Sequence, residues 1–212
     1  MRVDVTRLGA AAALAALLAL PAMAEERPAF PPARDVAVTY KVNSSQIKTA
    51  PEVVLRYSAA ADRFRVEGGL PGYVLVDRRA GHASIVLERL GVIMDAPPRA
   101  GLDQAFLLEN GKHFVRKGGD TVAGQQCTIW EVGGDSASGS ACVTADGVVL
   151  RASGHDRKGR SGSIEATHVD YAQQAETLFF PPPDLHKVDL AGGLLAGPAV
   201  SAMLDRLRRG QP

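Results

Sequence analysis

Histidines are the side chains in this sequence best suited to acid–base or metal chemistry. There are five of them, and no two are separated by two or four residues: His82, His113, His155, His168 and His186. Those spacings would place imidazoles on one face of a strand or helix, where the ligands of a metal gather. No histidine lies near a cysteine in the sequence either. The sequence therefore predicts no metal site, and we expect no cofactor.

One histidine has a carboxylate close enough to assist it. His168 and Asp170 are two residues apart in a predicted strand, so they share a face and the carboxylate could orient the imidazole. A hydrolase would also need a nucleophile beside them, and no G-x-S-x-G elbow occurs. Walker loops and dinucleotide-binding fingerprints are absent as well. Hydrolysis is therefore the weakest of three hypotheses, and we expect no catalytic residues and no enzyme.

The two cysteines, Cys127 and Cys142, predict a disulfide. They lie beside two runs that are typical of strands, 128–132 and 141–144, joined by the Gly- and Ser-rich segment 133–139. Antiparallel pairing across this segment puts Cys127 opposite Cys142, at a Cα separation that a disulfide can bridge. The alternative is a redox-active or metal-binding pair, but the sequence has no Cys-x-x-Cys motif.

Apolar side chains give the candidate binding site. The segment 102–108 has more apolar residues than one packing face of a helix needs. Leu107 is the additional one, because it lies outside the face that would pack on the sheet. One interpretation is a helix that simply plugs the sheet. The other is a movable lid over an apolar pocket, with Phe106, Leu107 and Leu108 against the ligand. Trp130 has the opposite parity to Cys127, and it would either pack in the core or form a pocket wall.

The elements that must position these residues are mostly short strands. Alternating residues beginning with Val36 and Val38 predict a strand over 35–42. Two hairpins are predicted next, 52–57 with 63–67 and 73–77 with 83–88, followed by a further strand at 91–95. After Pro97 and Pro98 the period changes to that of a short helix, which ends at Asn110 and Gly111. Further strands are predicted at 147–151 and 163–171, and a second helix within 190–209.

A run of short strands linked by hairpins predicts a mainly β fold. Such a chain forms a sandwich or a curled, barrel-like antiparallel meander, because a long meander has to protect its edges. One or two helices are expected to cover it. Aromatic residues make up only 5% of the chain and there is a single Trp, so a sugar-stacking surface is not expected.

The first 24 residues have the features of a secretory signal peptide. Arg2 and Arg7 precede an apolar run from Gly9 to Leu20, and Ala22-Met23-Ala24 matches an A-x-A cleavage site. The apolar run is shorter than the roughly 20 residues that a membrane-spanning helix needs. We expect cleavage after Ala24 and a periplasmic protein, a location in which disulfides persist.

The remaining chain is expected to fold as one domain with two short additions. A Pro-rich lead-in, 25–34, precedes a β domain over 35–190, and 191–212 is a C-terminal helical tail. Removing the signal peptide leaves a formally neutral chain, so a nucleic-acid partner is not expected. The tail has a basic end beside apolar residues, which would allow peripheral contact with an anionic membrane.

Several phrases resemble those of the periplasmic lipoprotein-carrier family, the LolA/LolB type. Asp62-Arg63-Phe64-Arg65-Val66 resembles the family's R-x-F strand, and Tyr73-Val74-Leu75-Val76-Asp77 resembles its ILVSDG-like strand. The other matches are Phe106-Leu107-Leu108, Gly147-Val148-Val149-Leu150, and the closing phrase from Phe180-Pro181-Pro182 to Val188-Asp189. Leu185 and His186 stand where the family has a glycine. The cysteine pair and the Pro-rich lead-in depart from the carrier pattern and point to an uncharacterised branch of the superfamily.

The resemblance implies a curled, incomplete antiparallel barrel whose open face is covered by helices, around an apolar cavity that takes acyl chains. The first hypothesis is therefore a non-enzymatic periplasmic binder or carrier of a lipid or of the acyl chain of a lipoprotein. The second is a structural or interaction protein of the cell envelope that docks a partner through a sheet edge or the tail 199–209. For the first hypothesis the partner is a hydrophobic ligand or an acylated protein, and we expect a monomer.

Overall fold

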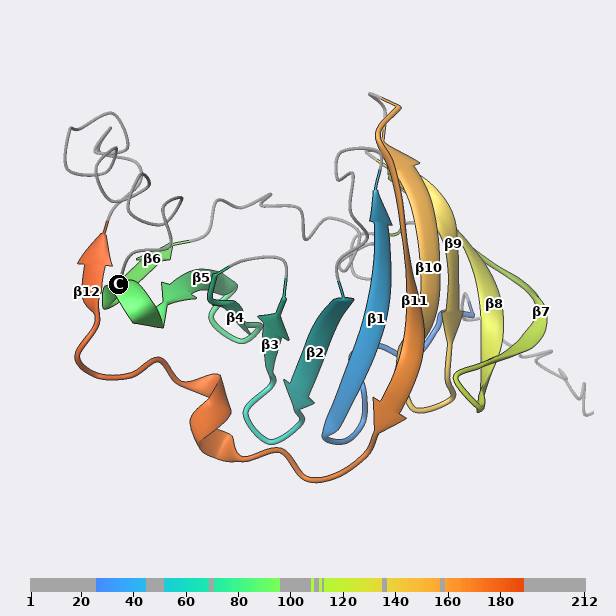
Figure 1. Ribbon diagram of the computed structural model, residues 1–212. Coiled ribbons are helices and arrows are strands. Elements are labelled where there is room, and N and C mark those ends of the chain that lie inside the picture. The colour runs from blue at the N-terminus through green and yellow to red at the C-terminus, as the bar shows by residue number, and fades with distance from the viewer. Residues whose placement is uncertain are drawn as a thin grey trace, which may run out of the picture.

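The computed structural model describes residues 26–44, 52–68, 71–95, 108, 111, 113–134, 137–156 and 159–188. Within these residues the fold is a single curled sheet of twelve strands (Figure 1). The strands are β1 (Val36–Ser44), β2 (Glu52–Ser58), β3 (Arg63–Glu67), β4 (Tyr73–Asp77), β5 (His82–Leu87), β6 (Val92–Asp95), β7 (His113–Val122), β8 (Gln125–Gly133), β9 (Ala137–Val143), β10 (Val149–Asp156), β11 (Ser161–Asp170) and β12 (His186–Val188). Two short 3₁₀ helices, η1 (Glu88–Leu90) and η3 (Glu176–Phe179), complete the described elements.

The sheet consists of two antiparallel meanders joined in its middle. The strand order is β12-β6-β5-β4-β3-β2-β1-β11-β10-β9-β8-β7. Strands β1 to β6 form one meander and β7 to β11 the other, and β1 pairs antiparallel with β11 at the junction. The expectation of a mainly β, curled and incomplete barrel is confirmed, but the strands form two meanders rather than one. Between β6 and β7 the chain passes from β6, which lies next to the edge strand β12, to the opposite edge of the sheet. Hairpin signals cannot show such a crossing.

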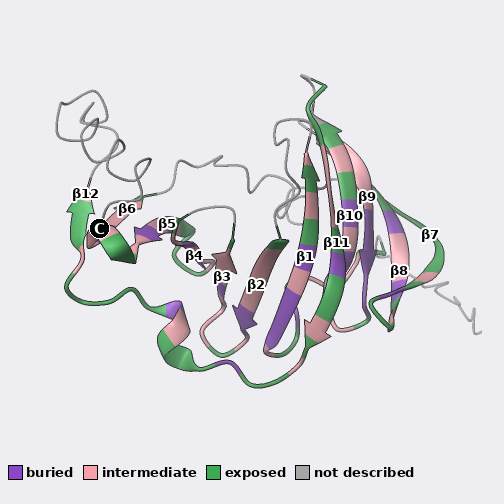
Figure 2. Cartoon of the chain, in the orientation of Figure 1, coloured by how far each residue is buried: buried purple, intermediate pink, exposed green. Residues whose placement is uncertain are grey.

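Strand β1 forms because its alternating side chains face the core. Val36, Val38 and Tyr40 are all almost fully buried, as the alternation predicted. A bulge between Thr39 and Tyr40 shifts its register with β11, and bulges bend and twist a strand locally. In Figure 2 buried residues are seen on strands of both meanders, among them β1, β8 and β9, whereas the edge strand β12 is largely exposed.

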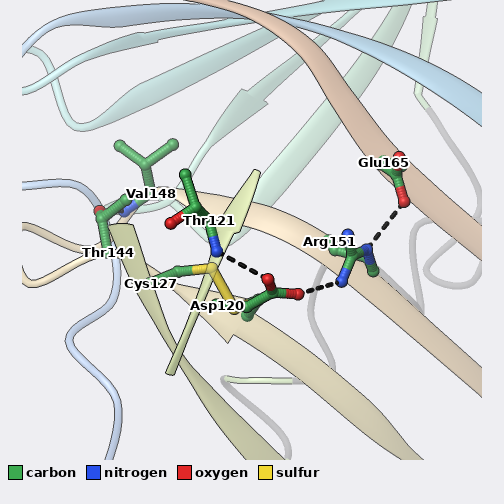
Figure 3. The surroundings of a disulfide bond; sticks show 8 residues. Asp120, Thr121, Cys127, Thr144, Val148, Arg151 and Glu165 are labelled. Carbon is green, nitrogen blue, oxygen red and sulfur yellow. Dashed lines mark hydrogen bonds and ion pairs between the residues drawn. A yellow bond between two sulfur atoms is a disulfide. The ribbon is translucent and has the colours of Figure 1, made fainter. Parts of the chain in front are cut away.

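The disulfide between Cys127 and Cys142 is present, with the two Cα atoms 5.4 Å apart. Its predicted register was wrong by two residues, because Cys142 lies opposite Ile129 in the β8–β9 pair. Strand β8 continues to Gly133, so the connector between the strands is shorter than predicted. A shift of two residues keeps every side chain on its face, and the cysteines still meet. Figure 3 shows Arg151 beside the disulfide, between Asp120 and Glu165.

The C-terminal strap, residues 171–188, runs past the ends of β2 to β5 and adds β12 to the edge of the sheet (Figure 1). Strand β12 pairs parallel with β6. Phe179 is 1% exposed and anchors the strap. Arg63 and Arg65 donate hydrogen bonds to the carbonyls of Phe179 and Leu178, at 3.2 and 3.0 Å. The C-terminal strap is thereby tied to the first meander.

Several expectations fall on residues outside the described ones. They are the signal peptide over 1–24, most of the short helix over 102–109 and the tail over 191–212. Leu108, which the structure does describe, has helical backbone and is buried. The predicted boundaries of the lead-in, the β domain and the tail stay predictions. Among the described residues, no helix is long and apolar enough to cross a membrane.

Candidate functional site

The candidate site is an apolar cavity enclosed where the two meanders meet. Its walls come from strands of both meanders, from the lead-in and from Leu108. Strand β1 contributes Val36, Val38 and Tyr40, which are its core-facing residues. The other described lining residues are Phe30, Pro32, Leu55, Phe64, Val66, Val76, Leu108, Ala141, Gly147, Val148, Val149, Ala152 and Ile164. The curl of the sheet therefore brings together residues that are distant in the sequence.

The cavity is apolar and small in this conformation. None of the described residues that line it carries a charge, and the free space between them is about 50 Å³. Pockets for drug-sized ligands have volumes of roughly 300–1,000 Å³. The walls are thus suited to an apolar group, but side chains already fill most of the interior. A ligand longer than a few carbons could enter only if some of these side chains moved.

Among the described residues that line the cavity, Tyr40 alone has a polar side-chain group. Its hydroxyl donates a hydrogen bond of 2.6 Å to the carbonyl oxygen of Val149. Val149 lies at a register shift of β10 with β9, where the regular pairing of the two strands is interrupted. Burial raises the pKa of the Tyr40 phenol far above its ordinary value, and the charge on Tyr171 raises it further. Tyr40 is therefore neutral and structural rather than an acid or base.

Two larger depressions on the molecule are open and polar. One, of about 1,050 Å³, crosses the ends of β1 and β7 to β11 and has serines along it with His113 and His155 at its side. The other, of about 620 Å³, lies between the C-terminal strap and the turns near Arg63 and Asp77. Arg63 and Asp77 bind each other, with Nε 3.0 Å from Oδ2. These depressions face solvent, and we take the enclosed cavity as the better candidate site.

The predicted site residues are placed only in part. Leu108 lines the cavity and shares a buried cluster with Trp130, so the structure brings these two together. Trp130 is 5% exposed and packs among core residues, behind the cavity wall rather than in it. Phe106 and Leu107 lie outside the described residues. Their role against a ligand stays a prediction.

Most of the cavity wall was not predicted as a site. The alternation in β1 predicted that Val36, Val38 and Tyr40 face the core, but nothing in the sequence showed that a space remains beside them. Phe30 was placed in the lead-in without a role. Its signal was present, because Phe30 is the single aromatic residue in a segment rich in proline.

His168 and Asp170 do not form a catalytic pair in this structure. His168 is exposed on β11, and Asp170 accepts a hydrogen bond from the backbone of Ala172 at 2.9 Å. Neither residue lines the cavity or the two depressions described above. Within the described residues, no group of three or more His, Cys, Asp or Glu residues could hold a metal.

Comparison with known proteins finds relatives by structure alone. No family model matches the chain, and no curated protein matches it in sequence. An uncharacterized conserved protein from Thermus thermophilus matches with a TM-score of 0.51 and 14% identity, over 74% of this chain and 91% of that chain. MucB in its complex with MucA, from Pseudomonas aeruginosa, matches with a TM-score of 0.46 and 18% identity, over 74% of this chain and 59% of that chain. A LolA superfamily protein from Nitrosomonas europaea matches with a TM-score of 0.38 and 9% identity, over 70% of this chain and 91% of that chain.

These matches concern the fold. The Thermus protein shares it with this chain. The curled, open sheet that the resemblance to the LolA/LolB type implied is the architecture observed in the described residues.

Proposed function

We propose that this protein is a non-enzymatic periplasmic binder or carrier of a hydrophobic ligand, either a lipid or the acyl chain of a lipoprotein. The observation that supports this most is the enclosed cavity between the two meanders, whose described walls carry no charge. Affinity would come from burial of apolar surface, at about 25 cal/mol per Å². The predicted signal peptide and the disulfide agree with a periplasmic location.

The proposal includes a lid. Phe106, Leu107 and Leu108 would cover the ligand, and Trp130 would support Leu108 from behind, since both belong to one buried cluster. Substituting Phe106→Asp should then weaken ligand retention without unfolding the sheet. If lipid binding survived that change unaltered, the lid would have to be abandoned.

A fatty acid with a dansyl group at its end is a suitable probe. Trp130 is the only tryptophan, so energy transfer from it to the dansyl group reports binding near the cavity. Each further methylene buried should strengthen binding by about 0.8 kcal/mol, or about fourfold in Kd, until the cavity is full. An affinity that did not depend on chain length would contradict binding in an apolar cavity.

Neighbouring residues of β10 offer a matched pair of variants. Ala152 lines the cavity, whereas Ser153 is exposed on the opposite face. Ala152→Leu should weaken binding by about tenfold or more, because its added carbons displace ligand methylenes worth about 0.8 kcal/mol each. Ser153→Leu adds the same kind of bulk outside the cavity and should leave binding unchanged. Equal effects of the two substitutions would count against the cavity as the binding site.

The second candidate is an interaction protein that docks a partner through the edge of the sheet or through the C-terminal tail, 199–209. Strand β7 ends the strand order, and its Val115 is 50% exposed. However, a register shift between Arg116 and Gly118 interrupts this edge, and bulges and charges oppose further pairing. Native mass spectrometry of residues 25–212 purified without detergent separates the candidates. A protein mass that includes a bound lipid supports the carrier. A mass of the protein alone, with no uptake of added lipid, favours the interaction protein.

The tail gives a further distinction between these candidates. Deleting residues 199–212 should leave uptake of the dansyl fatty acid unchanged if the cavity is the functional site. If an interaction protein docks its partner through the tail, the same deletion should remove partner binding.

A further inference from the structure

The lead-in, described over residues 26–34, lies over the cavity instead of extending into solvent. The segment, blue in Figure 1, passes behind the central strands towards β7 and β8. The Phe30 ring stacks on Phe64 with centroids 6.1 Å apart and planes 12° from parallel. Phe30 packs against both buried clusters that meet at the cavity. Phe30 and Pro32 are therefore cavity walls that the sheet itself does not provide.

The lead-in is held at its two ends by contacts near the surface. At one end, the Arg27 guanidinium lies 4.7 Å from the centre of the Phe114 ring and donates to the carbonyl of Gly111 at 3.1 Å. At the other end, Arg34 binds Asp146 at 3.0 Å and lies 3.7 Å from the centre of the Tyr171 ring. Exposed ion pairs and ring contacts of this kind are individually weak.

The sheet side of this contact is shaped for the lead-in. Gly147 has φ +92°, and a Cβ at this position would lie 2.6 Å from the carbonyl oxygen of Pro31. The backbone of Ala33 donates to the carbonyl of Asp146 at 2.8 Å. The turn at 144–148 thus accepts the lead-in closely, but the lead-in forms no strand and makes few backbone hydrogen bonds with the sheet. It can leave without breaking the strand ladder.

We infer that the lead-in is a built-in competitor for the cavity, with Phe30 in the place that the end of an unbranched alkyl chain takes in the bound state. This inference rests on the proposed function. The free space of about 50 Å³ is what remains while Phe30 is seated. An entering chain displaces Phe30, and the weak contacts of Arg27 and Arg34 allow the segment to release. A protein whose competent state is only partly populated binds with a proportionally reduced affinity, so Phe30 sets how tightly a chain is held.

The test compares two phenylalanine substitutions with dansylaminoundecanoic acid as the probe. Phe30→Ala removes the competing ring and should lower the Kd by about tenfold, since a larger share of the protein is then competent to bind. Phe180→Ala is the matched control, because Phe180 is 44% exposed and lies over Arg63, away from the cavity. It should leave the Kd unchanged. Thermal unfolding of each variant establishes that it folds.

A second variant loosens the lead-in without touching a cavity wall. Arg34→Ala removes the contacts with Asp146 and Tyr171, and it should lower the Kd by about two- to fivefold, in keeping with the loss of a surface ion pair and a ring contact. If the wild-type protein binds the probe and neither Phe30→Ala nor Arg34→Ala binds it more tightly, the lead-in is not a competitor. If none of the proteins binds the probe, the proposed function fails and this inference fails with it.

Discussion

Tyr40 shows how a single polar group is accommodated in an apolar interior. Its hydroxyl satisfies the Val149 carbonyl at the point where the β9–β10 register shifts. A buried carbonyl left without a partner costs about 1–3 kcal/mol, which is more than an average hydrogen bond contributes.

We therefore expect Tyr40→Phe to lower the free energy of unfolding by about 1–3 kcal/mol, measured by urea denaturation. Tyr171→Phe is the control, because Tyr171 is only partly buried and its hydroxyl lies 3.3 Å from Asp146 at the surface. That change should cost less. Equal losses for the two variants would mean that the Val149 carbonyl finds another partner.

Asp77 makes stability depend on pH in the acid range. The backbone amide of Ala80 lowers the pKa of Asp77, burial opposes this shift, and Arg63 lowers the pKa further. Since the folded-state pKa lies below the ordinary value of 3.8, the stabilisation is complete above that pH. It is lost as the pH falls through the folded-state pKa.

The corresponding variant is Asp77→Asn, which cannot titrate. We expect it to be less stable than the wild type at pH 7, with a difference that shrinks as the pH falls below about 4. Chemical denaturation between pH 7 and pH 2.5 measures both curves. A difference that stayed constant over this range would show that Asp77 acts through packing rather than through its charge.

At the scale of elements, the disulfide links β8 to β9. The two cysteines are 15 residues apart, and closing a loop of this length stabilises a fold by about 3 kcal/mol. The double substitution Cys127→Ala with Cys142→Ala should lower the free energy of unfolding by about that amount, measured by urea denaturation. Reduction of the wild-type protein should give a similar loss. A loss below about 1 kcal/mol would indicate that the turn and the ladder alone hold these strands.

The 144–148 turn and the lead-in are a second pair of elements in direct contact, at Gly147 and Pro31. Gly147 and Gly124 both have positive φ, at +92° and +75°, but nothing lies within 4 Å of a Cβ placed at Gly124. Gly124→Ala should therefore cost about 1 kcal/mol for the backbone alone. Gly147→Ala should cost more and should expose the lead-in to proteolysis, because its Cβ meets Pro31. Identical behaviour of the two variants would mean that the lead-in moves aside freely.

The strands were the most predictable elements, and their partners the least. The period-two pattern around Val38 and the hairpin signals near residues 58–62 and 78–81 gave the strands of the first meander almost to the residue. The register of β8 with β9 could not be derived in the same way. A disulfide can join cysteines that lie directly opposite each other or cysteines two residues apart in register. Both arrangements put the two side chains on the same face of the sheet, so the sequence pattern is the same for both. Only the true length of the connector between the strands distinguishes them.

The candidate site was less predictable than the strands. Leu108 and Trp130 were identified from an excess of apolar residues and from parity, and both lie in or behind the cavity wall. Phe30 and Tyr40 could not be assigned to a site, because a cavity depends on how far the sheet curls and on where the lead-in comes to lie. These properties arise from contacts between residues far apart in the sequence.

For the whole molecule, stability should fall from the centre of the sheet to its edges. Strands β1 and β11 form the junction of the two meanders, whereas β12 contributes three mostly exposed residues at one edge and β7 forms the other. Hydrogen exchange should therefore be slowest for the amides of β1 and β11 and fastest for those of β7 and β12. Protection of β12 as strong as that of β1 would show that the C-terminal strap is part of the cooperative core.

The crossing between β6 and β7 divides the chain into two pieces that are contiguous in sequence. Everything before it builds β1 to β6, and everything after it builds β7 to β12. Strands of the two pieces pair along two seams, β1 with β11 in the middle of the sheet and β6 with β12 at its edge. A protein cut at this crossing should thus behave as a pair of complementing fragments that reassemble through strand pairing. The fold could then serve as a split reporter in which assembly and enclosure of the apolar space happen together.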